Sequence, residues 1–201
     1  HFVIYISGCS CAAAIAVIGI LPGGVVTKKE TADIRLDENG EFIRDPETDI
    51  VKVAVVERHQ GTGNVACGFL KGYGIREGAV ALSVAHDSHN IIVVGVSDEE
   101  MEFAVNSLIA QEGGIVLVKE GKVIESMPMP IAGLMSDQSG EWVDQKLTDI
   151  HEKAYSELGI SGEVEPVMTL CFMSLAVIPE VKLTDMGLFD VTTFSFISTE
   201  A

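Results

Sequence analysis

The stretch that organises this sequence is Ser83-Val84-Ala85-His86-Asp87-Ser88-His89-Asn90-Ile91-Ile92-Val93-Val94-Gly95. An apolar run, Gly78–Val84, leads into it, and a β-branched run closes it. Two such runs around a polar group predict two neighbouring strands joined by a turn. Polar side chains between strands either bond at the sheet edge or face a site, because burying them unpaired is costly. The stretch therefore predicts a sheet and a candidate site together.

The flanking sequence extends this sheet and adds helices. Ile50–Val56 is mostly apolar and β-branched, which is typical of a central strand. Further predicted elements are a strand ending near Pro22, extended pieces such as 33–36, a hairpin of 114–119 and 122–127 around Glu120-Gly121, and helices over 97–113 and 141–158. We expect Ser97 and Glu100 to form a capping box, with Met101, Ala104, Val105, Leu108 and Ile109 on the apolar face. Residues 167–178 fit a helix or a strand. The fold class is α+β: one domain with helices packed on a mixed β-sheet.

The composition excludes some partners. The chain has 201 residues, with 13 basic and 30 acidic side chains and a formal net charge of −17. Nucleic acids and anionic membranes are bound through clusters of Lys and Arg, and this chain has no such cluster. We expect no nucleic-acid or membrane partner.

The N-terminal segment differs from the rest. Residues 1–15 are apolar and begin without Met, and we treat them as a separate segment that can be foreign to the natural protein. The apolar run 2–21 is long enough for a bilayer. It lacks a basic flank, contains Ser7 and Ser10, and also reads as a buried strand, so no membrane span is expected. Residues 16–201 form the predicted domain. The four cysteines of the whole chain are expected to be reduced thiols of a cytoplasmic protein.

Three interpretations of the polar turn are open. Histidine ordinarily titrates near neutrality, and Asp87 can orient the ring of His86 or His89, which favours acid–base catalysis, with Ser88 and Asn90 as substrate contacts. A metal site is a weaker possibility, because neither an HxH pair nor an HExxH helix accompanies these residues. The third interpretation is that the side chains only satisfy backbone groups at the sheet edge.

A second candidate site follows the strand Ile50–Val56. Polar residues after a buried strand, followed by glycines, are typical of a binding loop. The candidate substrate-binding residues in it are Glu57, Arg58, His59, Thr62 and Asn64. The alternative is a Glu57–Arg58 ion pair and a plain turn. Ser136-Asp137 is a weaker candidate, which we interpret as a helix cap.

Several of these segments together resemble one known family, the C-terminal domain of bacterial adenine deaminase. They are 17–23, 55–59, 61–64, 85–95, 130–136 and 183–185 with 187–188, in the same order along the chain. The resemblance implies a parent enzyme of the metal-dependent amidohydrolase superfamily that hydrolyses adenine to hypoxanthine and ammonia in purine salvage. It also implies Mn or Fe in a preceding barrel. This chain has no HxH motif and is too short to contain that barrel.

The resemblance therefore predicts a domain that is inactive alone, holds no metal or other cofactor and needs a barrel in the same polypeptide or in a partner. The contributing catalytic residues would be His86, Asp87 and His89, at the barrel interface and directed toward the purine. A homo-oligomer is expected. Whether the chain alone is an enzyme is open, and the alternatives are a stand-alone purine-binding module and a dimerisation module.

Overall fold

The computed structural model describes residues 12–23 and 25–200. The strands are β1 (Ala12–Ile20), β2 (Thr27–Leu36), β3 (Phe42–Ile43), β4 (Ile50–Val56), β5 (Val65–Lys71), β6 (Ala79–Leu82), β7 (Ile91–Gly95), β8 (Gly114–Lys119), β9 (Lys122–Pro128), β10 (Val181–Thr184), β11 (Gly187–Asp190) and β12 (Ser195–Phe196). The helices are α1 (Asp98–Ala110), α2 (Gly140–Ser156) and α3 (Pro166–Cys171). The predicted separate segment 1–15 lies mostly outside the described residues.

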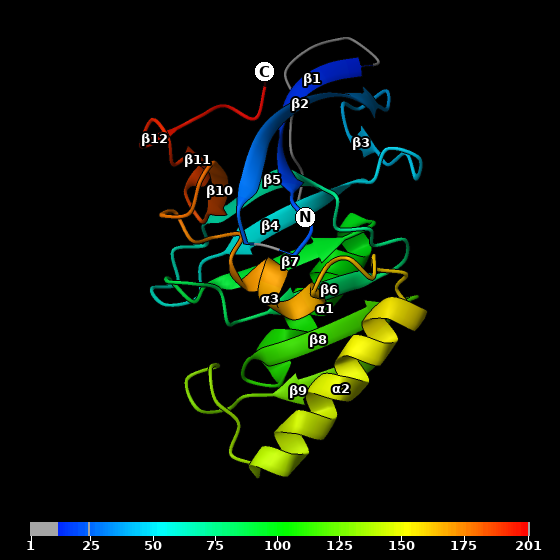
Figure 1. Ribbon diagram of the computed structural model, residues 1–201, viewed down its shortest axis with the longest axis vertical. Coiled ribbons are helices and arrows are strands. Elements are labelled where there is room, and N and C mark those ends of the chain that lie inside the picture. The colour runs from blue at the N-terminus through cyan, green and yellow to red at the C-terminus, as the bar shows by residue number, and fades with distance from the viewer. Residues whose placement is uncertain (1–11, 24, 201) are drawn as a thin grey trace.

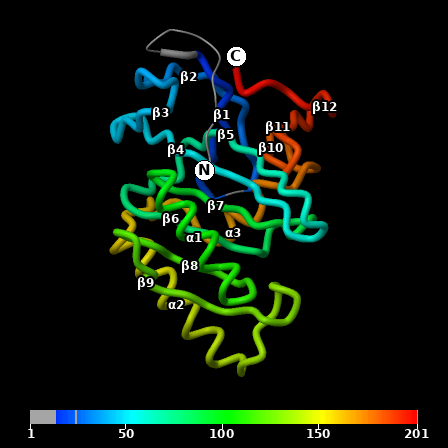
Figure 2. The backbone as a smooth tube through the Cα atoms, turned by 180° about the vertical axis from the view of Figure 1, so that it is seen from behind, coloured from blue at the N-terminus to red at the C-terminus, as the bar shows by residue number. Residues whose placement is uncertain are grey.

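Nine strands form one mixed sheet, ordered β3-β2-β1-β5-β4-β7-β6-β8-β9. β1 pairs parallel with β5, whereas β4 pairs antiparallel with both β5 and β7. A second sheet, β10-β11-β12, lies beside the first (Figure 1). Seen from behind, α2 again runs along β9 at one end of the large sheet (Figure 2). This is the α+β architecture that the sequence predicts.

Helices cover both faces of the sheet, which explains why its central strands are almost entirely apolar. Small side chains under α1, such as Ala54, Ala79 and Ala81, let that helix approach closely. On the other face, Val53, Val55 and residues of β7 join α2, α3 and the small sheet in the largest core cluster. Lys52 is the one charged residue of β4. Its side-chain amine forms an ion pair with Asp98 of α1.

The predicted helix and hairpin boundaries are largely confirmed. Ser97 caps α1, its hydroxyl accepting from the N–H of Glu100 at 3.3 Å. Ile109 is an exception: it is 56% exposed, so the buried face of α1 is narrower than its pattern indicates. The ambiguous run 167–178 is a short helix, α3, followed by turns. Within the described residues, no helix combines the length and apolar character that a membrane crossing requires.

Two cysteines of the described part, Cys67 and Cys171, are free thiols. Burial raises the pKa of Cys67 to about 11 and that of Cys171 to about 12. Both therefore carry a proton at neutral pH and act as small apolar side chains. The prediction for Cys9 and Cys11 falls outside the described residues.

Lys182 of β10 is a fully buried amine. Its exposed fraction is 0%, and its Nζ donates to the carbonyl of Val25 at 2.7 Å. Desolvation lowers the pKa of Lys182 to about 8. The unfolded chain keeps this proton up to a pKa of about 10.4. Between these values the unfolded state binds more protons, so stability rises with pH in this window.

We expect urea denaturation to detect this effect. Between pH 7.5 and 9.5 the free energy of unfolding of the wild-type chain should rise by about 2 kcal/mol relative to Lys182→Met, which has no amine to titrate. The variant serves as the control because every other titrating group is common to both proteins. Parallel pH profiles of the two proteins would contradict this assignment.

Candidate functional site

Three loops meet at one end of the large sheet. Val56, the last residue of β4, pairs with Ile91, the first of β7, so the loops 57–64 and 83–90 emerge side by side. Gly114 of β8 pairs with Pro128 of β9, which places the following loop, 130–136, at the same end. We call residues 57–64, 83–90 and 130–136 the loop cluster. It unites two predicted sites that lie more than 20 residues apart in the sequence.

Arg58 ties the loop cluster together. Its Nε donates to the carbonyl of His89 at 2.5 Å, and its Nη2 donates to the carbonyl of Ala132 at 2.9 Å. Its backbone N–H donates to Oδ1 of Asn90 at 3.3 Å. At Gly133 (φ +72°), an added Cβ would lie 3.0 Å from Nη1 of Arg58, so glycine makes room for the guanidinium. Arg58, itself in the first loop, therefore links this loop to the second and third loops by hydrogen bonds.

His86 and His89 lie next to each other in the second loop. Their ring centroids are 5.4 Å apart at an interplanar angle of 63°, and the ring of Phe172 lies 4.8 Å from that of His86. His89 takes a left-handed conformation, φ +53°, and its Nδ1 is buried without a hydrogen-bond partner. Burial lowers the pKa of His89, and the charges of His86 and Arg58 act in the same direction. A neutral imidazole is thus favoured at His89 at neutral pH.

The first loop is organised around the carboxylate of Glu57. It accepts from the backbone N–H groups of Thr62 at 3.0 Å and Gln60 at 2.7 Å, and also from that of His59. These bonds lower the pKa of Glu57 to about 2, so it stays ionised. His59 reaches the second loop, its Nε2 lying 2.7 Å from the carbonyl oxygen of Ser88. The loop is thus built by Glu57 and attached through His59.

The predicted site residues differ in exposure. His59, Thr62, Asn64, Asp87 and Ser88 are exposed, while Glu57, Arg58, His86 and His89 are partly buried. Asn90 is only 3% exposed, and its amide oxygen accepts from Arg58. The rings of His59, His86 and His89 thus form the imidazole group of the loop cluster, and Asn90 contributes to its framework.

One alternative and one local prediction differ from the structure. The alternative of a Glu57–Arg58 ion pair is not observed, because the carboxylate binds backbone N–H groups and the guanidinium binds carbonyls. Ser136 and Asp137 do not cap a helix: α2 begins at Gly140, and Ser139 is its cap, accepting from the N–H of Trp142. The hydroxyl of Ser136 accepts instead from the N–H of Gln138, which stabilises a turn.

Sequence reasoning missed three residues that support the site. Phe172 packs on His86, and Ser174 donates from its hydroxyl to the carbonyl of His86 at 3.2 Å. Ser83 is buried, donates to the carbonyl of Gly133 at 2.5 Å and accepts from the N–H of Gly114. The local sequence does not mark Phe172 and Ser174 as site residues, because both lie in the run 167–178, whose pattern fits either a helix or a strand. Ser83 begins the polar stretch quoted at the start, but only its contacts reveal its supporting role.

Comparison with known proteins defines the family. The profile of the adenine deaminase C-terminal domain matches residues 24–195. "Adenine deaminase 2" of Desulfotalea psychrophila is 70% identical over 185 residues, which cover 92% of this chain and 32% of that protein. "Adenine deaminase" of Ligilactobacillus salivarius is 48% identical over 183 residues, 91% of this chain and 32% of the relative.

The chain belongs to the adenine deaminase C-terminal domain family. It spans about a third of the length of the curated relatives that it matches. The sequence resemblance is thereby confirmed, and the chain corresponds to the C-terminal domain of an adenine deaminase-like protein.

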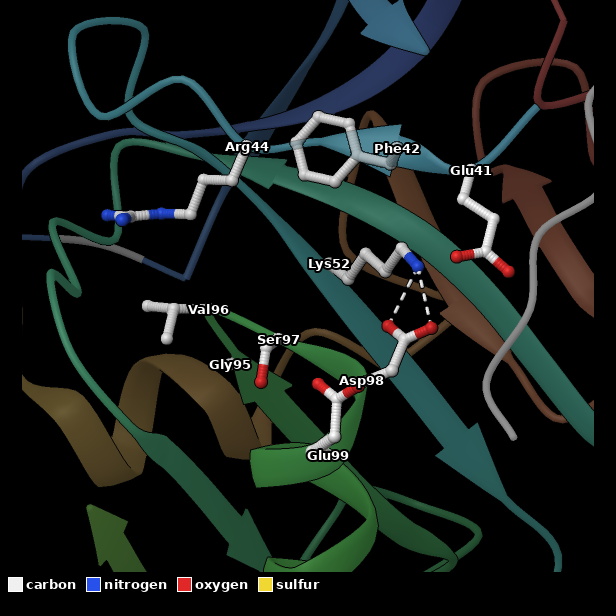
Figure 3. A pocket seen from close by; sticks show the side chains of 9 residues that line it. All are labelled: Glu41, Phe42, Arg44, Lys52, Gly95, Val96, Ser97, Asp98 and Glu99. Atoms are coloured by element: carbon white, nitrogen blue, oxygen red, sulfur yellow. Dashed lines mark hydrogen bonds and ion pairs between the residues drawn. The ribbon is translucent and has the colours of Figure 1, made fainter. Parts of the chain in front are cut away.

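A polar pocket lies at the opposite end of β4 and β7 from the loop cluster. It has a volume of about 160 Å³, and Figure 3 shows Lys52 and Asp98 facing each other across it. Lys52 Nζ lies 2.7 and 2.9 Å from the two carboxylate oxygens of Asp98. Since these opposite charges satisfy each other, we interpret this pocket as part of the connection between β4 and α1.

Metal ligands are not grouped in the described part of the domain. Residues 12–23 and 25–200 contain no cluster of three or more His, Cys, Asp or Glu side chains suited to a metal ion. The imidazoles of the loop cluster therefore do not fit the metal centre of the superfamily, and no step of a reaction is assigned to a metal in this chain.

Proposed function

We propose that this domain works as part of an adenine deaminase, whose reaction converts adenine and water to hypoxanthine and ammonia, and that its loop cluster borders the purine. The family assignment supports the reaction, since the relatives are named adenine deaminases. The observation that carries the site is the group of three imidazoles, from His59, His86 and His89, which Arg58 and backbone bonds hold on one end of the sheet.

The chemistry of this group suits a purine. A purine offers ring nitrogens that accept or donate hydrogen bonds, and neutral imidazole does both. The rings of His86 and Phe172, 4.8 Å apart, form an aromatic surface beside those groups. Deamination also needs a proton on the leaving amine, which a side chain that titrates near neutrality can supply. His86 and His89 are the contributing residues, and the charge of Asp87, exposed between them, acts to raise the pKa of His89.

The proposal places the metal and the attacking water outside this chain, in a preceding amidohydrolase barrel that carries Mn or Fe. That barrel is the partner, in the same polypeptide or in another subunit. We further propose a homo-oligomer in the cytoplasm that serves purine salvage. Glu57, Thr62, Asn64, Ser88 and Asn90 then shape the edge of the purine site.

An exchange experiment tests the proposed function. The matched 185 residues of the Desulfotalea psychrophila relative are replaced by this chain, and adenine deamination is measured with Mn²⁺ or Fe²⁺. We expect the exchanged polypeptide to deaminate adenine and the 201-residue chain alone to be inactive. Deamination by the chain alone, or an inactive exchange beside an active relative, would overturn the proposal. Calorimetric binding of adenine to the chain alone, together with an inactive exchange, would favour the purine-binding module.

A further inference from the structure

A cluster of phenylalanine rings lies on the outer face of the small sheet. The ring of Phe189 contacts those of Phe194 and Phe196 edge to face, each at a centroid distance of 5.2 Å. Phe194 is 75% exposed, Phe196 51% and the nearby hairpin residue Met186 71%. We call Met186, Phe189, Phe194 and Phe196 the aromatic patch.

The inner face of the small sheet accounts for its packing in this domain. Leu183 and Leu188 are buried, and both approach Gly68 of β5, where an added Cβ would lie 3.5 Å from Leu183. Phe189 and Phe196 pair with each other in register and point to the other side. None of the core clusters of residues 12–23 and 25–200 includes the aromatic patch. The patch therefore lies outside these core clusters, although Phe189 pairs with the buried Lys182 of β10.

The composition around the patch is that of an interface. Residues 191–198, Val-Thr-Thr-Phe-Ser-Phe-Ile-Ser, carry no charge in a chain where 21% of the residues are charged. Interface cores are enriched in aromatic residues and methionine and depleted of charge. Contiguous exposed apolar surface on a soluble protein commonly marks such a contact.

The relatives indicate what covers this surface. About two thirds of each relative lies outside the match, and the matched part is the C-terminal domain, so the remaining polypeptide precedes it. In this chain the segment after β12 returns to β1: the N–H of Ala16 donates to the carbonyl of Thr199 at 2.8 Å, and Ile15 bridges to Glu200. A path from Ala12 to Phe196 thus runs along β1 to Ala16, crosses the hydrogen bond to Thr199 and returns along the tail. It includes four residues of β1 after Ala12 and three residues of the tail.

That path is at most roughly 30 Å long, at about 3.3 Å per extended residue. A preceding domain of several hundred residues has a radius of gyration of roughly 20 Å. We propose that the aromatic patch is the docking surface for the polypeptide that precedes this domain in its relatives. This proposal rests on the proposed function, in which the domain is part of a larger enzyme.

A comparison of the same variant in two contexts tests the docking. The double variant Phe194→Ser/Phe196→Ser is made in the chain alone and in the exchanged polypeptide. In the chain alone, the midpoint of thermal unfolding should change by less than about 2 °C, because both rings are exposed there. In the exchanged polypeptide, the midpoint for this domain should fall by more than about 5 °C, since about 1 kcal/mol corresponds to several degrees.

Phe103→Ser is the matched control, because Phe103 is 39% exposed on α1, across the large sheet. It should lower the midpoint equally in both contexts. Equal effects of the double variant in the two contexts would overturn the docking. So would a dimer of the chain alone that the double variant dissociates, because a second copy would then cover the patch.

The deamination assay separates this proposal from the proposed function. An exchanged polypeptide that deaminates adenine but shows no context-dependent loss of stability refutes only the docking surface. An exchanged polypeptide that shows that loss but never deaminates refutes only the proposed function.

Discussion

Replacing His86 by alanine in the exchanged polypeptide is expected to lower kcat/KM for adenine by about 10²-fold or more, the range typical of a lost acid–base group. His86 is partly buried, packs on Phe172 and lies 5.4 Å from the ring of His89. Its backbone N–H donates to the carbonyl of Cys171, and its carbonyl accepts from Ser174. Because alanine keeps both backbone bonds, the variant removes the ring and leaves the loop in place.

The matched control is His151→Ala. His151 lies on α2, and its ring contacts the carboxylate of Glu165, away from the loop cluster. Steady-state kinetics across pH 5–9 and thermal unfolding of both variants give the comparison. We expect His86→Ala to alter the pH profile and His151→Ala to leave it unchanged. Unchanged turnover and unchanged KM for adenine in His86→Ala would show that the loop cluster does not border the purine.

Gly78→Ala is expected to prevent stable folding, with a loss of roughly 4 kcal/mol or more. Gly78 lies just before β6 at φ +69°, and an added Cβ would be 1.9 Å from the carbonyl oxygen of Val118 and 2.8 Å from Leu158. The obstacle is backbone of the neighbouring strand β8, which no side-chain rotation relieves. β6 would separate from β8, and the strand that leads into the second loop would move with it.

Gly121→Ala isolates the steric part of this effect. Gly121 has φ +66° in the turn between β8 and β9, and no atom lies within 4 Å of its added Cβ. Its substitution should cost only the left-handed backbone strain, about 1–2 kcal/mol. Urea denaturation of both variants gives the difference, and soluble yield with protease resistance replaces it if Gly78→Ala does not fold. A cost for Gly78→Ala within about 1 kcal/mol of that for Gly121→Ala would refute the steric account.

Local patterns predicted much of the fold because they act over a few residues. The Ser97–Glu100 cap, the hairpin around Glu120-Gly121 and the apolar strand 50–56 each depend on neighbours within about five positions. Ile109 shows the limit of this reasoning. Periodicity places it on the apolar face, and only the position of the sheet leaves it exposed. Ser136 and Ser139 are both suitable caps by residue type, and the observed start of α2 distinguishes them.

Some features of the candidate site likewise follow from the local sequence, and others follow only from the tertiary structure. Residue types alone identified the imidazoles of His86 and His89 and the loop after β4, because polar groups between apolar strands need partners. The partners themselves depend on which strands are adjacent. Arg58 binds the carbonyl of Ala132, 74 positions away, and no feature of the sequence near Arg58 specifies that bond. The same holds for Phe172 beside His86.

Fold class, family and the chemical character of the site thus follow from the amino-acid sequence, since they rest on local propensity and on motifs that occur in the order seen in the family. The meeting of the three loops, the bonding role of Arg58 and the exposure of the aromatic patch follow only from the assembled sheets. Strand order sets them, and strand order results from burying apolar side chains on both faces of β4 and β7 at once. Contacts between residues so distant in sequence are a property of that packing.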